Sequence, residues 1–159
     1  MAEEEKNITC RKATQADAKL IFDWSNDPLV RAQSFNSAEI VWENHVKWFE
    51  KKLQSTTDLL LVALVNNVPA GLVRFENINQ KTTIGVLLDD AFRGKGLSSK
   101  IILGATDYYF SEHSGPISAF IKAENLASVK AFQKSGFTFV QQLKINHLPS
   151  VEYVLAKHF

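Results

Sequence analysis

Cysteine and long apolar runs are scarce in this sequence, and each scarcity excludes a class of protein. The single cysteine, Cys10, cannot form an intramolecular disulfide or a cysteine-based zinc site, and no metal is expected. We expect Cys10 to be a small buried residue of the first strand rather than a nucleophile. No apolar run approaches the roughly 20 residues of a membrane-spanning helix, and the acidic residues 1–6 do not resemble a signal peptide. The sequence therefore predicts a cytoplasmic protein with no membrane partner.

Neither sign of charge dominates the chain. The 18 Lys and Arg residues and the 17 Asp and Glu residues are scattered along it and give a formal net charge of +1. Binding to nucleic acid requires clustered basic residues, so no nucleic-acid partner is expected. Apolar residues make up 45% of the 159, which is enough for a sizeable core. The sequence predicts a single domain over residues 1–159, in which residues 1–7 form a flexible tail.

Hydrophobic periodicity divides the chain into strands and helices. Apolar runs predict strands at 8–13, 59–65, 69–76, 82–89, 116–123, 137–143 and 151–157. Helical spacing predicts four helices, which start near Thr14, Ser37, Ser98 and Asn125. Pro28 is expected to end the first helix, Ser37 to cap the second, and the three strands over 59–89 to form a meander. This order of elements is an α/β layer arrangement.

The stretch Arg93-Gly94-Lys95-Gly96-Leu97-Ser98 lies between a predicted strand and a predicted helix. Glycines let backbone N–H groups approach a ligand, and a helix N-terminus adds partial positive charge, so such a loop suits an anion. A dinucleotide fingerprint is excluded because Ser99 occupies the place of its third glycine, and a P-loop is excluded because no Gly-Lys-Ser/Thr is present. Taken alone, the loop also suits an ordinary strand-to-helix turn.

A second segment, Asn125 to Phe137, follows downstream. The two segments, in this order, resemble the pyrophosphate loop and a later helix of the GNAT superfamily of acyl-CoA-dependent N-acyltransferases. The loop pattern Gln/Arg-x-x-Gly-x-Gly/Ala is matched at Arg93 and Gly96. The helix pattern Asn-x-x-Ser/Ala-x-x-x-Tyr-x-x-x-Gly-Phe is matched at Asn125, Ser128, Gly136 and Phe137. Two positions depart from these patterns, since Ser98 replaces a Gly or Ala and Phe132 replaces the Tyr.

The resemblance covers nearly the whole chain and implies a GNAT fold, with a central mixed, mostly antiparallel sheet of about seven strands flanked by about four helices. It also implies acetyl-CoA as the donor. The pyrophosphate would meet the backbone N–H groups of Gly94, Lys95, Gly96, Leu97, Ser98 and Ser99. Arg93 would add charge there or remain a solvated loop cation.

The same resemblance implies contacts for the rest of the donor. The backbone of Leu87 and Leu88 would pair with the pantetheine amides, and an N–H, assigned to Leu88, would polarise the thioester carbonyl. Asn125, Ser128 and Phe132 would contact the donor arm, although Asn125 equally suits a simple helix cap.

Phe132 stands where the family has its usual acid, and phenylalanine has no proton to give. A thiol resembling cysteine has a pKa of about 8.5, so the thiolate is a fair leaving group without an acid. The sequence therefore predicts direct transfer in a ternary complex, with water or another group supplying the proton. Candidates for the base are Glu76, Glu124 and His45, and each also suits a purely structural role.

The acceptor is expected to contact the first two helices. Their residues resemble the GNAT subgroup that acetylates nucleotide-linked amino sugars, and the acceptor-side candidates are Trp24, Asn26, Arg31, Phe35 and His45. Aromatic faces suit a sugar ring or a base, and an arginine suits a diphosphate. The same residues also suit an apolar seam between helices. A peptide N-terminus as acceptor, a non-catalytic acyl-CoA-binding module and a homodimer are left open.

Overall fold

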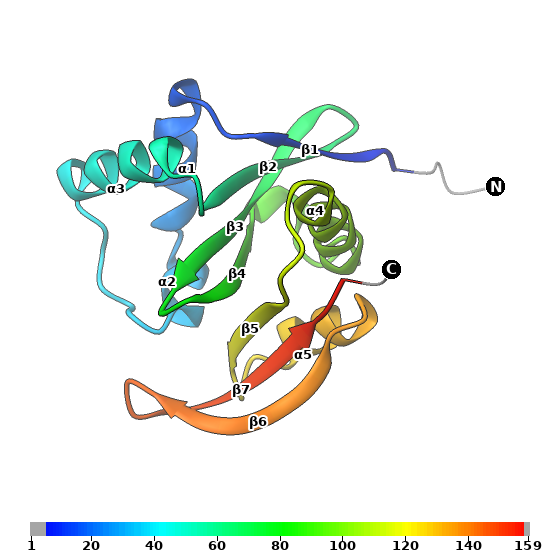
Figure 1. Ribbon diagram of the computed structural model, residues 1–159. Helices are drawn as coiled ribbons and strands as arrows, with labels where there is room; N and C mark the ends of the chain where they lie inside the picture. The colour runs from blue at the N-terminus through cyan, green and yellow to red at the C-terminus, as the bar shows by residue number, and fades with distance from the viewer. Residues whose placement is uncertain (1–5, 158–159) are drawn as a thin grey trace.

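The computed structural model describes residues 6–157, which form a seven-stranded sheet with helices on both faces (Figure 1). The strands are β1 (Ile8–Lys12), β2 (Leu59–Val65), β3 (Val68–Ile78), β4 (Lys81–Leu88), β5 (Ile117–Lys122), β6 (Thr138–Ile145) and β7 (Leu148–Leu155). The helices are α1 (Ala18–Ser25), α2 (Pro28–Gln33), α3 (Trp42–Gln54), α4 (Ser98–Glu112) and α5 (Leu126–Lys134). The α/β class predicted from the sequence is confirmed.

The strands follow the order β1-β2-β3-β4-β5-β7-β6. The pair β4 and β5 is parallel, whereas the other neighbours in this order are antiparallel. The predicted meander of β2, β3 and β4 is confirmed, and its first turn is the pair Asn66 and Asn67, with φ of +50° and +66°. Two residues with positive φ give the tight hairpin turn that matches the twist of the strands. The sheet is therefore mixed and mostly antiparallel, as expected.

One helix was not predicted, and it starts at the proline expected only to end α1. Proline lacks an N–H group and has its φ fixed near −65°, so it both stops a helix and suits the first position of the next. Asp27 caps α2, because its Oδ1 accepts the N–H groups of Leu29 at 2.9 Å and Val30 at 3.4 Å. Residues 6–157 therefore contain five α-helices, where about four were predicted.

The start of α3 also differs from the prediction, since the helix begins at Trp42 and Ser37 does not cap it. The side chain of Asn26 holds the preceding link in an extended form. Its Nδ2 donates to the carbonyl of Ile40 and its Oδ1 accepts the N–H of Ile40, both at 2.8 Å. Helical hydrogen bonding therefore starts only after this clamp.

The N-terminal segment is ordered from an earlier point than expected. Asn7 donates its N–H to Oδ1 of Asn66 at 2.9 Å, and the N–H of Asn66 donates to the carbonyl of Asn7 at 2.8 Å. The predicted tail therefore does not extend to Asn7, and residues 1–5 of that prediction lie outside the described residues.

Helices α1, α2 and α3 lie on one face of the sheet, and α4 and α5 lie on the other (Figure 1). Ile21, Trp24 and Phe49 of the first group pack against β-strand residues that include Leu72 and Leu87. Alternate residues of a strand point to opposite faces, so the side chains of β3 that follow Leu72 at every second position share the α1–α3 face. In residues 6–157, no helix is long and apolar enough to cross a membrane.

Candidate active site

The sheet splits between its two parallel strands. Only Thr82 with Ile117 and Thr83 with Ser118 pair across β4 and β5. From Ile84 to Leu88, strand β4 keeps its pairing with β3 and has no partner residue on β5. A free strand edge presents backbone N–H and C=O groups, and a ligand with amide groups can pair with it as an added strand. This gap includes Leu87 and Leu88, the residues predicted to pair with pantetheine.

The glycine loop lies at the end of β4, between the 3₁₀ turn Asp90–Phe92 and the start of α4. Gly94 and Gly96 have φ of +71° and +69°, a conformation that side chains other than glycine rarely adopt. A Cβ on either would have no neighbour within 4 Å, so the loop is open on its outer side. The N-cap of α4, Leu97, gives no side-chain cap, which leaves the N–H groups of the first turn for an anion. The predicted start of this helix at Ser98 is confirmed.

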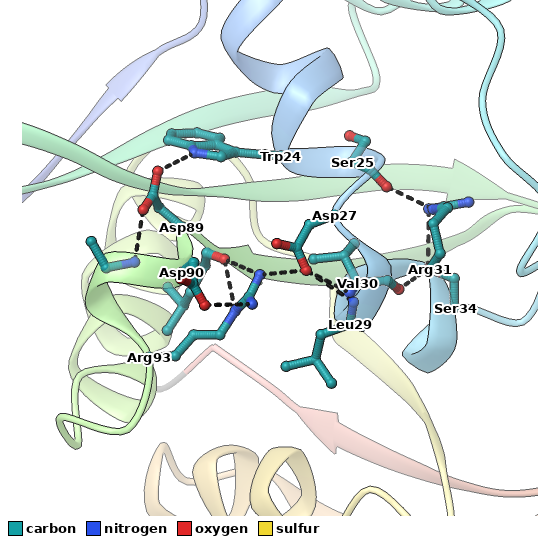
Figure 2. A network of polar contacts seen from close by, with 12 residues as sticks. Trp24, Ser25, Asp27, Leu29, Val30, Arg31, Ser34, Asp89, Asp90 and Arg93 are labelled. Atoms are coloured by element: carbon teal, nitrogen blue, oxygen red, sulfur yellow. Dashed lines mark hydrogen bonds and ion pairs between the residues drawn. The ribbon is translucent and has the colours of Figure 1, made fainter.

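The charge of Arg93 is directed toward the protein rather than the open side of the loop (Figure 2). Its Nη2 donates to the carbonyl of Leu88 at 3.0 Å and lies 3.1 Å from Oδ1 of Asp27, and its Nη1 lies 3.3 Å from Oδ1 of Asp90. Burial alone would raise the pKa of Asp27, but hydrogen bonds from Arg93 and from the α2 N–H groups hold that pKa below its ordinary value. Arg93 thus ties the end of β4 to the start of α2.

The second motif forms α5. Asn125 caps this helix, with its Oδ1 accepting the N–H of Ser128 at 3.3 Å, so the structural role weighed for Asn125 is present. Gly136 follows the end of α5 and has a φ of +92°. Phe132 is 4% exposed, and its ring meets Phe137 edge to face at a centroid distance of 5.0 Å. The departure from tyrosine therefore places an apolar ring in the core.

Glu76 lies beside the split in the sheet. It pairs with Thr83 of β4, which is also the last residue of β4 that pairs with β5. Its Oε2 lies 3.0 Å from Nζ of Lys52, and its Oε1 lies 3.3 Å from Nε of Arg74. Both oxygens of Glu76 therefore face cations, which hold the carboxylate in one position.

The other candidates for the base lie in different surroundings. Glu124 is exposed in the turn between β5 and α5. His45 is 3% exposed, its Nε2 is 2.8 Å from the carbonyl of Ala18, and its ring stacks on Phe49. Burial lowers the pKa of His45, with the bond to Ala18 opposing this shift. Cys10 is half-buried in β1, where burial raises the pKa of its thiol to about 11, so it is protonated at neutral pH.

Most of the residues predicted on the acceptor side are internal. Trp24 is 5% exposed, and its Nε1 donates to Oδ2 of Asp89 at 2.7 Å (Figure 2). Asn26 is occupied by the Ile40 clamp. The guanidinium of Arg31 donates to the carbonyls of Ser25, Asn36 and Ala38 and to Oγ of Ser34. Those four bonds use most of its five N–H donors, which leaves little of Arg31 for a diphosphate.

His45 likewise belongs to the aromatic seam between α1 and α3, with Phe22, Trp42, Trp48 and Phe49 around its ring. These aromatic residues therefore form the apolar seam between helices that was the alternative interpretation of the sequence. Phe35 is half-buried in the link between α2 and α3, where its carbonyl accepts a hydrogen bond from Nδ2 of Asn146 at 3.3 Å.

A model of the acetyltransferase (GNAT) domain family matches residues 7–138 of the chain, which span the split sheet, the glycine loop and the capped helix. The chain belongs to the GNAT acetyltransferase family. The resemblance to the GNAT superfamily predicted from the sequence is confirmed. Among curated proteins, the uncharacterized protein MJ1062 of Methanocaldococcus jannaschii is 24% identical over 139 residues. Those residues are 84% of this chain, and the match spans 28% of the length of that relative.

Solved structures confirm the fold of this acetyltransferase. The aminoglycoside acetyltransferase AAC(6')-Ib in complex with coenzyme A is 17% identical with a TM-score of 0.81, over 95% of each chain. The spermidine N-acetyltransferase of Vibrio cholerae, in complex with CoA and spermine, is 18% identical with a TM-score of 0.82, over 94% of this chain and 95% of that one. An N-acetyltransferase of Staphylococcus aureus Mu50 is 22% identical with a TM-score of 0.79, over 94% of this chain and 98% of that one.

Two cationic residues near the split, Arg74 and Lys122, were not identified from the sequence. Arg74 of β3 lies over Gly85, because a Cβ built on that glycine would be 2.8 Å from Nε and 2.9 Å from Cζ of Arg74. Lys122 ends β5, is 9% exposed, and donates to the carbonyl of Ala32 at 2.8 Å. The signal was available, since Arg74 interrupts an apolar strand two residues before Glu76, at a spacing that puts both on one face.

A groove also lies away from the glycine loop. It has a volume of about 420 Å³ and runs between the C-terminal half of α4 and the end of β7, lined by residues that include Leu103, Phe110 and Leu155. It is separated from the glycine loop, which lies at the other end of α4. Its size alone does not make it the donor site, because it lacks the free strand edge and the uncapped helix N-terminus.

Proposed function

We propose that this acetyltransferase transfers the acetyl group of acetyl-CoA to the primary amine of a nucleotide-linked amino sugar, by direct attack in a ternary complex. The observation that carries the donor half is the free edge of β4 over Ile84–Leu88, which leads directly into a glycine loop and an uncapped helix. Few ligands other than a long amide-bearing arm joined to a pyrophosphate would use both features at once.

The donor fits the residues present. The backbone N–H groups of residues 94–99 would hold the pyrophosphate, and the edge at Leu87 and Leu88 would hold the pantetheine amides. Asn125, Ser128 and Phe132 would contact the donor arm. Acetyl-CoA supplies the thioester, and a backbone N–H of β4, assigned to Leu88, would stabilise negative charge on its carbonyl oxygen.

Glu76 is the base we favour, because it lies beside the split and Lys52 and Arg74 fix both of its oxygens. A water between Glu76 and the ammonium of the acceptor would carry the proton away. Glu124 is the second candidate, since it lies exposed in the turn after β5. Replacing Glu76 by Gln should lower kcat by about 10²-fold or more if it is the base, with little change in the KM for acetyl-CoA.

The acceptor class rests on the resemblance of residues 24–31 to the amino-sugar subgroup. It is also compatible with the presence of an aminoglycoside acetyltransferase among the structural neighbours. Arg31, Trp24 and His45 have internal partners, so the acceptor contacts would come from other residues of the same face.

Thiol release from acetyl-CoA tests the proposal, measured with nucleotide amino sugars, polyamines, amino acids and peptides with free N-termini. Turnover confined to nucleotide amino sugars is the expected result. Turnover confined to peptides would instead assign the chain to protein Nα-acetylation.

The buried phenyl ring of Phe132 favours one other candidate, a module that binds acyl-CoA without catalysis. Calorimetric binding of acetyl-CoA with no turnover on any acceptor would support that module. Under the enzyme proposal, Phe132→Tyr should change kcat by less than about threefold, because the thiolate leaves unaided. A rise of 10² or more would show that a missing acid limits the rate.

A further inference from the structure

Arg74 lies on the α1–α3 face and has one donor atom without a hydrogen-bond partner. Its Nε is buried with no hydrogen-bond partner, although it lies 3.3 Å from Oε1 of Glu76. Its side chain is 37% exposed, so a ligand can reach the guanidinium. A planar fork of donors in this state is suited to a carboxylate or a phosphate, which it can bind through two parallel bonds.

Near Arg74, positively charged side chains outnumber the carboxylates. Glu76 is shared with Lys52, and Asp58 is also paired with Lys52, with Nζ–O distances of 3.0 Å and 3.1 Å. Arg31 donates only to carbonyls and to one hydroxyl, so it brings a positive charge without a carboxylate. Burial, and then the nearby charge of Arg74, lower the pKa of Arg31. Two guanidinium groups repel one another, and an anion beside them would relieve the repulsion.

Arg74 lies near the end of the free edge of β4 that is farther from the glycine loop, on the side expected for the donor's thioester. Gly85, over which the guanidinium lies, is in the part of β4 that has no partner on β5. Lys122 is on the same face across the split, with Glu124 beside it in a small hollow of about 90 Å³. The pyrophosphate loop is at the other end of the free edge, so the donor's phosphates would lie away from Arg74.

We infer that Arg74 binds an anionic group, phosphate or carboxylate, carried by the acceptor amine. This inference rests on the proposed acetyl transfer and narrows its acceptor to amines that also bear such an anion. A purely cationic polyamine would place more positive charge beside Arg74 and Arg31, and is disfavoured for the same reason.

Paired acceptors test this most directly. Glucosamine and glucosamine 1-phosphate share the amine and differ in the anion, and 6-aminohexanoate against hexylamine makes the same comparison for a carboxylate. The preferred anionic member should exceed its neutral partner in kcat/KM by tenfold or more. Arg74→Met should remove that preference, because it should lower kcat/KM for the anionic amine at least tenfold more than for its neutral partner, and it should leave the KM for acetyl-CoA unchanged. Lys19→Met, which removes an exposed charge of α1, should preserve the preference.

An equal loss of kcat/KM for neutral and anionic amines in Arg74→Met would give Arg74 only a structural role and overturn the inference. So would the lack of any preference in the unaltered protein. If no amine is turned over, the acetyl-transfer proposal fails but the anion subsite can still be measured. Calorimetry of inorganic pyrophosphate with the CoA-saturated protein should then show binding that Arg74→Met abolishes. Absent binding, or equal binding by the variant, would contradict the subsite.

Discussion

Asp27 joins two parts of the site through one carboxylate. It caps α2 by accepting two backbone N–H groups, and it pairs with Arg93 at the end of β4 (Figure 2). Cap and ion pair can be separated by substitution, because asparagine also caps helices well but carries no charge.

Asp27→Ala should lower the free energy of unfolding by about 1–2 kcal/mol, whereas Asp27→Asn should cost clearly less. The pKa of Asp27 is depressed in the folded protein, so the ion pair stabilises it above about pH 4, the unfolded pKa. That stabilisation is lost as the pH falls through the folded pKa. Urea unfolding from pH 3 to 7 should therefore show the Asn variant approaching the unaltered protein in acid. Equal losses in the two variants at pH 7 would contradict the capping role.

The sequence predicted the surroundings of single side chains least well. Trp24, Arg31 and His45 are residue types that bind sugars and phosphates, and a linear pattern does not show where their polar atoms point. The fold uses the indole N–H for Asp89, the guanidinium for backbone carbonyls and the imidazole for Ala18. Each of these contacts joins parts of the chain that only the folded protein brings together.

Helix α3 carries a histidine that makes the stability of the fold depend on pH. Burial lowers the pKa of His45 below 6.5, so the folded protein binds a proton at this site less readily than the unfolded chain. The stabilisation is complete above pH 6.5 and is lost as the pH falls from 6.5 toward the folded pKa.

Unfolding by urea between pH 7 and 5 checks this. The unaltered protein should lose stability relative to His45→Phe, by up to about 1.4 kcal/mol per pH unit. His147→Asn, at an exposed turn with φ of +66°, should behave like the unaltered protein. Parallel curves for the unaltered protein and His45→Phe would show that His45 does not titrate differently on folding.

The glycine loop is the element on which donor binding depends. Gly94→Ala and Gly96→Ala meet no steric neighbour, so their cost comes from a positive φ, roughly 1–2 kcal/mol each. Relief of that strain would turn loop N–H groups away from the pyrophosphate. Calorimetry should show at least tenfold weaker CoA binding for each variant. Gly115→Ala, at a glycine without positive φ and without neighbours, is the control and should bind normally. Unchanged CoA affinity in the loop variants would remove the loop from the donor site.

At the scale of the whole molecule, the sequence was most informative where local rules decide the structure. The seven strands, the Asn66 turn, the start of α4 and the end of α5 depend on apolar runs and on residues that tolerate positive φ. The boundary of α3 depends on a clamp from Asn26, and the position of Arg74 over Gly85 depends on the pairing of β3 with β4. The clamp and the position of Arg74 over Gly85 arise from contacts between distant parts of the chain, which no local pattern contains.

The central claim is that the split in the sheet and the glycine loop together hold acetyl-CoA through backbone groups. Hydrogen–deuterium exchange, measured with and without CoA, tests it at those groups. CoA should slow exchange in peptides covering residues 84–88 and 94–99, and leave the groove between α4 and β7 unaffected. Slower exchange confined to that groove, or no change over residues 84–99, would contradict the claim.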